Sequence, residues 1–174
     1  MVLGANRRHT LDHSMAEHLV VVEGPTDKAV VEEIARKLGV KVRVLLMRGN
    51  NPSKAARIVN SKLAVKEYCK VVILKDEHKY PRETINKLIS RMLEEIQYEK
   101  KHPIIVRKSI EAWILAGVGV ANPENIDGAG EHLGQVLLRR YGRRYIKLLG
   151  TAKRLMLDEH YKSGRGGWLV EGEA

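Results

Sequence analysis

The sequence predicts an α/β fold in which a four-stranded, mainly parallel sheet lies between helices. Apolar runs of strand length alternate with amphipathic stretches of helical length, a pattern typical of crossover units that connect parallel strands. Glycine and proline residues separate these runs where helices are expected to begin and end. At 174 residues the chain has room for one domain with a short appendage.

Each predicted strand is followed by a helical pattern. The predicted strands are residues 18–22, 41–47, 70–75 and 103–106. The first helix begins at Pro25, with Thr26 as its cap, and Gly39 ends it. Further helices are predicted over 53–65, around 85–96 and after Ser109, which is placed to cap the last of them. The clearest helix has apolar residues at helical spacing, namely Ile85, Leu88, Ile89, Met92, Leu93 and Ile96.

The pattern changes on both sides of this core. Residues 1–15 show no clear period, and we expect a flexible N-terminal extension. Residues 16–116 form the predicted α/β domain. Residues 117–174 begin as a Gly-, Pro- and Asn-containing loop and continue as a helical, basic C-terminal extension, with helical segments near 131–141 and 143–160.

The composition favours a polyanionic partner. Lysine and arginine number 31 against 21 acidic residues, so the formal net charge is +10. The extension is especially basic, and its arginines, interleaved with tyrosines, are predicted to bind a phosphate backbone: Arg139, Arg140, Arg143 and Arg144. A solvated, salt-bridged surface and an ordinary basic helix are the alternative interpretations.

Several classes of protein are excluded. The single cysteine, Cys69, allows neither an intramolecular disulfide nor a multi-cysteine zinc site. The loop at 48–54 lacks the glycines and the Lys-Ser/Thr ending of a P-loop. No apolar run approaches the roughly 20 residues of a membrane helix, and the N-terminus lacks the apolar centre of a signal peptide. We therefore expect a cytoplasmic protein that makes no contact with membranes.

Acidic residues follow two of the predicted strands. Glu23 ends the run HLVVVE, and Asp76, Glu77 and His78 end the run KVVILKDEH. Ligands of parallel sheets bind beyond the carboxyl ends of the strands. Carboxylates there suit Mg²⁺ or Mn²⁺, which accept a few protein oxygens and leave positions for water and phosphate. In extended geometry Asp76 and His78 project to the same side. We predict a metal-assisted phosphate site, with Glu23 moving a proton or binding the metal.

Other residues near these strand ends have two interpretations each. Asp27 at the helix start can interact favourably with the helix dipole or bind a metal ion. Lys28, near the start of the same helix, can bind a phosphate group or lie on the surface without a ligand. Arg48 and Lys54 flank the loop after the second predicted strand, where they can hold phosphate or face solvent.

The segments VVVEGPTD and VVILKDEH resemble the two motifs of the Toprim domain, an apolar strand ending in Glu-Gly and a strand ending in Asp-x-Asp. The resemblance covers roughly residues 16–116 and implies a Toprim-like (Rossmann-like) sheet. It further implies that Glu23 is the general acid or base, or joins the metal shell, and that Asp76 is the first metal-binding aspartate. His78 stands where the family has its second aspartate, and histidine suits manganese or zinc better than magnesium. Glu77 is then an alternative ligand.

A third segment, SIEAWILAG at 109–117, is similar to a Glu-Ala-Trp segment of single-domain Toprim nucleases and of nucleases like those of the overcoming-lysogenisation-defect family. This similarity suggests Glu111 as an additional acidic ligand, with helix capping or a surface position as its alternative.

Three functions remain open from the sequence. The first is a metal-dependent phosphodiesterase or nuclease acting on RNA or DNA. The second is a non-catalytic nucleic-acid-binding or scaffold module, which the departure at His78 favours. The third is small-molecule phosphoryl chemistry, such as phosphotransfer, since a fold does not specify a substrate. A homodimer is compatible with each.

Overall fold

The computed structural model describes residues 17–47, 51–77 and 80–142. The predicted N-terminal extension, Arg48, His78, Arg143, Arg144 and the helical segment near 143–160 lie outside these residues. None of the helices in the described ranges has the length and apolar character that a bilayer crossing requires.

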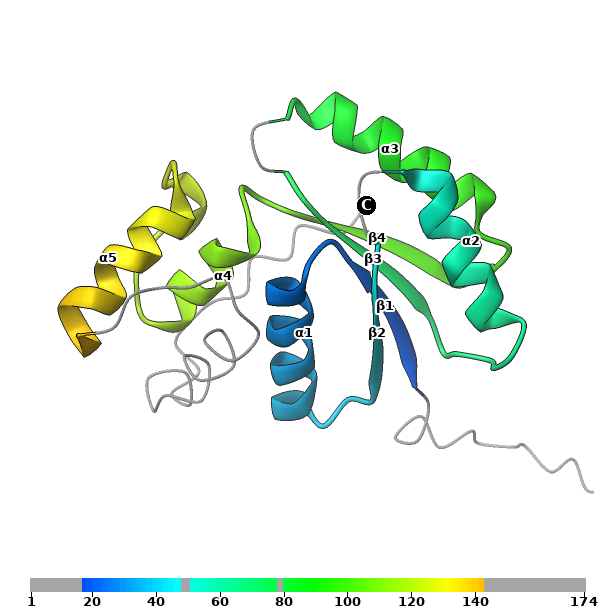
Figure 1. The fold of residues 1–174 in the computed structure, drawn as a ribbon, viewed down its shortest axis with the longest axis horizontal. Helices are drawn as coiled ribbons and strands as arrows, with labels where there is room; N and C mark the ends of the chain where they lie inside the picture. The colour runs from blue at the N-terminus through cyan, green and yellow to red at the C-terminus, as the bar shows by residue number, and fades with distance from the viewer. Residues whose placement is uncertain (1–16, 48–50, 78–79, 143–174) are drawn as a thin grey trace, which may run out of the picture.

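The predicted α/β fold is confirmed, as a Rossmann-like arrangement whose sheet is parallel throughout (Figure 1). The strands are β1 (His18–Val22), β2 (Val42–Leu46), β3 (Val71–Asp76) and β4 (Lys101–Val106), in the order β2-β1-β3-β4. Both later strands differ slightly from the prediction, because β3 includes Asp76 and β4 begins two residues earlier than Pro103. Strands β1 and β3 are direct neighbours, with Val21 opposite Ile73, so their carboxyl ends meet at one edge.

The helices follow the strands in the predicted alternation. They are α1 (Pro25–Leu38), α2 (Pro52–Leu63), α3 (Arg82–Glu95), α4 (Ile110–Gly117) and α5 (Ala129–Tyr141), with a short 3₁₀ helix at Pro123–Asn125. Gly39 ends α1 in the left-handed conformation, with φ 67°, as its place in the sequence predicts. The expectation that Thr26 caps α1 is wrong: the cap position is Gly24, and Thr26 is buried in the first turn.

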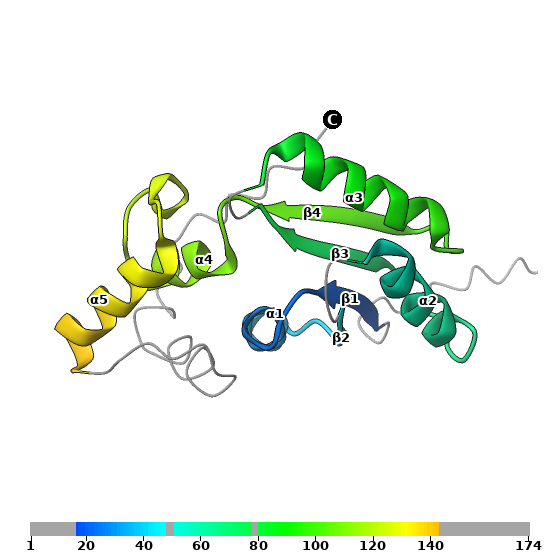
Figure 2. The same ribbon diagram turned by 45° about the horizontal axis from the view of Figure 1, so that its top comes forward.

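The two faces of the sheet carry separate cores because successive strand residues point to opposite sides. Leu19, Val21 and Ile73 pack against α2 and α3. Val20, Val22 and Leu74 pack against α1, α4 and α5. Figure 2 shows α2 and α3 together, whereas α4 and α5 lie beyond the arrowheads of β3 and β4.

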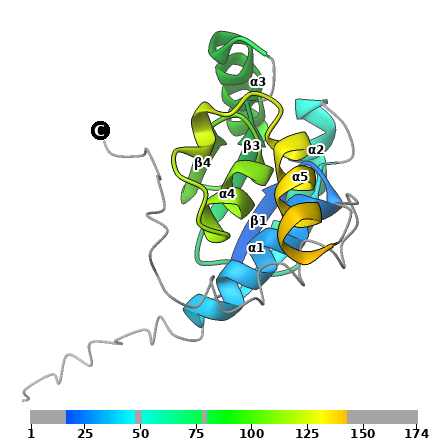
Figure 3. The same ribbon diagram turned by 90° about the vertical axis from the view of Figure 1, so that its left-hand side faces the viewer.

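The described part of the predicted C-terminal extension belongs to the second of these cores. Leu133 and Leu137 of α5 are fully buried and join the cluster that contains Val22 and Ile114. Figure 3 shows α4 and α5 in front of the strands when the molecule is viewed from its left-hand side. Apolar residues of α5 thus cover α4 close to the carboxyl edge of the sheet. At this edge β1 is followed by Glu23 and β3 ends at Asp76.

Candidate functional site

Buried polar side chains of the described residues gather at the carboxyl edge of the sheet. With the exception of Glu33 in the middle of α1, they lie at strand ends or in the first turn of a helix that follows a strand, and they are Thr26, Asp27, Lys75, Asp76 and Glu111. Burying a charged group is costly unless it is paired or hydrogen-bonded. A concentration of such groups at one edge therefore marks this edge as the candidate site.

Glu23 lies directly after β1, as the sequence predicts, and forms an ion pair with Lys75. The Lys75 Nζ donates a hydrogen bond to Glu23 Oε1. The Lys75 side chain is 6% exposed and the Glu23 side chain 21%, so this pair is largely withdrawn from solvent. Burial lowers the pKa of the Lys75 ammonium, and the nearby charge of Asp76 opposes that shift.

Sequence reasoning missed Lys75. The residue directly precedes Asp76 in the run VVILKD, where a charged side chain interrupts a buried strand. That interruption is the signal that could have identified it, because a lysine inside an apolar strand needs a partner. Its partner Glu23 is 52 residues away in the chain, and only the pairing of β1 with β3 brings the two together.

Asp76, the last residue of β3, is 3% exposed. Its Oδ2 accepts a hydrogen bond of 3.1 Å from the backbone N–H of Ile110, the first residue of α4. Glu77 makes a similar contact, since its Oε2 accepts a hydrogen bond of 3.4 Å from the backbone N–H of Lys108. The loop between β4 and α4 therefore holds both acidic residues that follow the strand.

This loop has an unusual backbone. Lys108 has φ 64°, a left-handed conformation that costs a residue with a side chain about 1 kcal/mol. Such strain persists where the surroundings enforce it, often at functional sites. Here the strained residue directs its N–H to Glu77, while its Nζ lies 2.7 Å from Asp127 Oδ1.

Glu111, suggested as an additional ligand, lies in the first turn of α4 and is 2% exposed. A Cβ atom on Gly130 of α5 would lie 3.9 Å from its Cγ, so α5 covers this carboxylate. A surface position for Glu111 is thus excluded. Ser109 occupies the predicted cap position of α4, but its side chain makes no capping hydrogen bond.

Asp27 serves the start of α1. Its Oδ2 accepts a hydrogen bond of 2.7 Å from the backbone N–H of Gly24, which closes the first helical turn. The sequence left a helix-dipole role and a metal role open for Asp27, and the observed contact with the first turn is a capping role that the sequence predicts for Thr26. The same contact also fixes the backbone next to Glu23.

The predicted phosphate-binding residues are spread over several elements. Lys28 lies 3.6 Å from Glu32 on α1, and Lys54 is an exposed residue in the first turn of α2. Arg139 and Arg140 are exposed at the end of α5. Arg140 donates a 2.5 Å hydrogen bond to the carbonyl oxygen of Val118, the C-cap residue of α4. Part of its guanidinium therefore binds the backbone at the C-terminal end of this helix.

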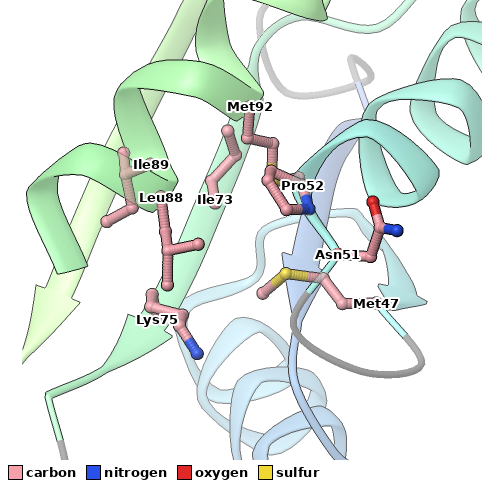
Figure 4. A pocket seen from close by; sticks show the side chains of 8 residues that line it. All are labelled: Met47, Asn51, Pro52, Ile73, Lys75, Leu88, Ile89 and Met92. Atoms are coloured by element: carbon pink, nitrogen blue, oxygen red, sulfur yellow. The ribbon is translucent and has the colours of Figure 1, made fainter. Parts of the chain in front are cut away.

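A small cavity lies on the α2/α3 side of Lys75. Its volume is about 20 Å³, and its wall is mainly apolar, with Met47, Ile73, Leu88 and Met92 among the lining residues. Figure 4 shows Lys75 extending from β3 beside Leu88, with its nitrogen directed away from the α3 side chains. The cavity has room for about one water molecule and is too small for a substrate.

The donor atoms at the carboxyl edge suit a hard divalent cation, since they are carboxylate oxygens at strand ends and helix starts. In residues 17–47, 51–77 and 80–142, however, no three His, Cys, Asp or Glu side chains come together in a group that could hold a metal ion. An ammonium, that of Lys75, contacts the glutamate instead.

No protein-family model matches this chain, and neither a curated protein nor a solved structure is similar enough to count as a match. The Toprim resemblance therefore stays a prediction that depends on the motifs themselves.

Proposed function

We propose that this protein is a Toprim-type, divalent-metal-dependent phosphodiesterase that cleaves RNA or DNA. The observation that carries the proposal is the gathering of buried charged residues at the carboxyl edge, with Glu23 directly after β1 and Asp76 at the end of the neighbouring parallel strand β3. Parallel α/β folds bind ligands at this edge. A formal net charge of +10 suits a nucleic-acid partner.

The proposed roles follow from the chemistry of each group. Asp76, with Glu111 or Glu77 and with His78, would hold Mg²⁺ or Mn²⁺, and the bound ion would lower the pKa of a water molecule or polarise a phosphoryl oxygen. Glu23 would transfer a proton at the scissile phosphate. Hydrogen bonds from the Ile110 and Lys108 backbone N–H groups help to position one oxygen of Asp76 and one of Glu77. Exposed arginines of α5 would contribute to strand binding.

The test is cleavage of single- and double-stranded RNA and DNA oligonucleotides with Mg²⁺ or Mn²⁺. Glu23→Gln keeps the size of the side chain and removes its charge, so we expect the rate to fall at least about 100-fold. Glu17→Gln is the matched control, because Glu17 pairs with Lys66 at the opposite edge of the sheet. Wild-type cleavage by the Glu23→Gln variant would overturn the proposed role of Glu23.

A non-catalytic nucleic-acid-binding module is the second candidate. It is favoured by the contact between Lys75 and Glu23, since a glutamate neutralised by a neighbouring lysine can have a purely structural role. This candidate predicts binding to oligonucleotides that weakens steeply as salt increases, with no turnover in any of several divalent metals.

A further inference from the structure

The outer face of α2 carries positive charge and no negative charge. The helix contains Lys54, Arg57 and Lys62 but no aspartate or glutamate. Among the five α-helices of the described residues it is alone in this respect, since each of the other four has an acidic residue in its first turn. The three basic side chains are exposed, and none of them forms an ion pair within residues 17–47, 51–77 and 80–142.

The contacts of α2 with the rest of the protein determine which face is turned outward. Ala55 and Val59 are buried in the core on one side of the sheet. On the flank next to α3, Ser53 Oγ donates a 2.6 Å hydrogen bond to Glu95 Oε1, and Asn60 Nδ2 donates one of 2.8 Å to the Glu95 carbonyl oxygen. The basic side chains lie on the remaining surface of the helix, at the outside of the molecule (Figure 2).

The spacing of these charges does not stabilise the helix. Lys54 and Arg57 are three residues apart and are therefore neighbours on the helix surface, where two positive charges repel each other. On α3, by contrast, Lys87 Nζ lies 2.7 Å from Glu83 Oε1, one turn away. The charge of α2 is therefore better explained by a polyanionic ligand than by the stability of the helix itself.

The start of α2 lies at the carboxyl edge of the sheet. Asn51 and Pro52 line the same small cavity as Lys75 (Figure 4). Lys75 in turn contacts Glu23, the carboxylate that the proposed mechanism uses. A ligand that follows α2 toward its first turn therefore arrives at the candidate site.

The length of the basic face fits a phosphate backbone. Lys54 and Lys62 are eight residues apart, which corresponds to about 12 Å along a helix. One strand of a duplex carries a phosphate about every 3.4 Å of its axis. The face thus spans about three phosphates, roughly as many as it has basic side chains.

We propose that the basic face of α2, formed by Lys54, Arg57 and Lys62, binds the phosphate backbone of a nucleic-acid strand and leads it to the carboxyl edge beside Glu23. This inference rests on the proposed function, from which it takes the nucleic-acid partner. It adds a binding surface distinct from the arginines of α5. Because contacts to phosphates carry no direct sequence information, binding along α2 should not depend on base sequence.

The test is the binding of fluorescein-labelled oligonucleotides, single-stranded and duplex, measured by anisotropy over a range of salt concentrations. EDTA is present, so that metal-dependent cleavage does not interfere. Combining Lys54→Gln, Arg57→Gln and Lys62→Gln should lower the affinity at least about tenfold. The slope of log affinity against log salt should become shallower by about two to three, because three phosphate contacts are lost. Glutamine is a good helix former, so these exposed changes should leave the fold intact.

The matched control combines Lys70→Gln, Lys87→Gln and Lys100→Gln. It also removes three positive charges from exposed side chains, at the amino edge and on α3. Its affinity and salt slope should stay close to those of the wild type, because exposed charges farther than about 8–10 Å from a phosphate are largely screened.

A second measurement uses the wild type alone. Amine-directed acetylation read by mass spectrometry reports the accessibility of each lysine. A bound oligonucleotide should decrease the labelling of Lys54 and Lys62 several-fold and leave Lys87 and Lys100 unchanged.

The outcomes separate this inference from the proposed function. Equal losses of affinity in the two triple variants, or wild-type binding by the α2 variant without protection of Lys54, would overturn only the role of α2. A wild-type protein that binds no oligonucleotide would overturn both proposals. Binding that requires α2, in a protein that cleaves no oligonucleotide with any divalent metal, would support the role of α2 and overturn the proposed nuclease.

Discussion

The carboxyl edge of the sheet carries charged groups inside the protein, whereas the amino edge carries them on its surface. At the carboxyl edge, Lys75 and Asp76 are buried side by side at the end of β3. At the amino edge, Lys66 and Glu17 form a 2.7 Å ion pair in which the lysine side chain is 57% exposed. Both edges contain ion pairs, but the carboxyl-edge pair bears the larger cost of desolvation, because its lysine side chain is only 6% exposed.

This difference teaches where to look for function in a fold of this kind. Exposed ion pairs contribute little to stability and are common on any surface. Buried charges are retained against their cost, and they cluster at functional sites more often than elsewhere. The contrast between the edges is therefore stronger support for a site than the net charge of the whole chain.

The largest effect is expected from breaking the buried pair. Lys75→Met leaves the Glu23 carboxylate without its ammonium, and we expect the free energy of unfolding to fall by about 3 kcal/mol in urea titrations. Part of this loss should return in the Glu23→Gln, Lys75→Met double variant, which leaves no uncompensated charge. Lys66→Met, by contrast, should unfold like the wild type because its pair is exposed. Equal stability of Lys75→Met and Lys66→Met would erase the contrast between the edges.

A somewhat smaller loss is expected from Asp76→Ala. This change removes the acceptor of the Ile110 backbone N–H, which is then buried without its present carboxylate partner. We expect the free energy of unfolding to fall by about 2 kcal/mol. Hydrogen exchange should show faster exchange of the Ile110 amide, with Asp127→Ala as an exposed control. An unchanged Ile110 amide would contradict the contact.

Gly130, near the carboxyl edge, and Gly39, at the amino edge, differ in backbone conformation, because only Gly39 of the two has a positive φ. Gly130→Ala near Glu111 meets only ordinary van der Waals contacts, so it should raise the free energy of unfolding by about 0.5 kcal/mol. Gly39→Ala at the amino edge meets no neighbour, yet φ 67° should make it destabilising by about 1 kcal/mol. Thermal unfolding of both variants measures the difference. Destabilisation by Gly130→Ala would mean that α5 packs more tightly on Glu111 than the contacts indicate.

The smallest effect concerns an exposed pair near the carboxyl edge. The hydrogen bond from Lys108 and its positive charge hold the pKa of Asp127 below its ordinary value. Because the folded-state pKa is the lower one, the pair adds stability above the unfolded-state pKa of Asp127. That stability is lost as the pH falls through the folded-state pKa. An NMR titration of Asp127 should show the low pKa in the wild type and an ordinary one in Lys108→Met.

Much of the site's location could be predicted from the sequence. The runs HLVVVE and VVILKDEH are apolar up to their acidic ends, and crossover units require the strands to be parallel, so Glu23 and Asp76 had to reach the same edge. The hydrogen-bond partners of these acidic side chains could not be predicted from the strand pattern. The contacts of Asp76 with Ile110 and of Glu77 with Lys108 depend on the path of the loop before α4.

The sequence by itself determined the alternation of strands and helices, because apolar periodicity and helix-ending residues are local properties of the chain. It also determined which acids end the strands. Only the tertiary structure decided that Lys75 neutralises Glu23 and that α5 covers Glu111. Both depend on strand order and helix packing, which bring together residues far apart in the chain and set how much water remains around each charge.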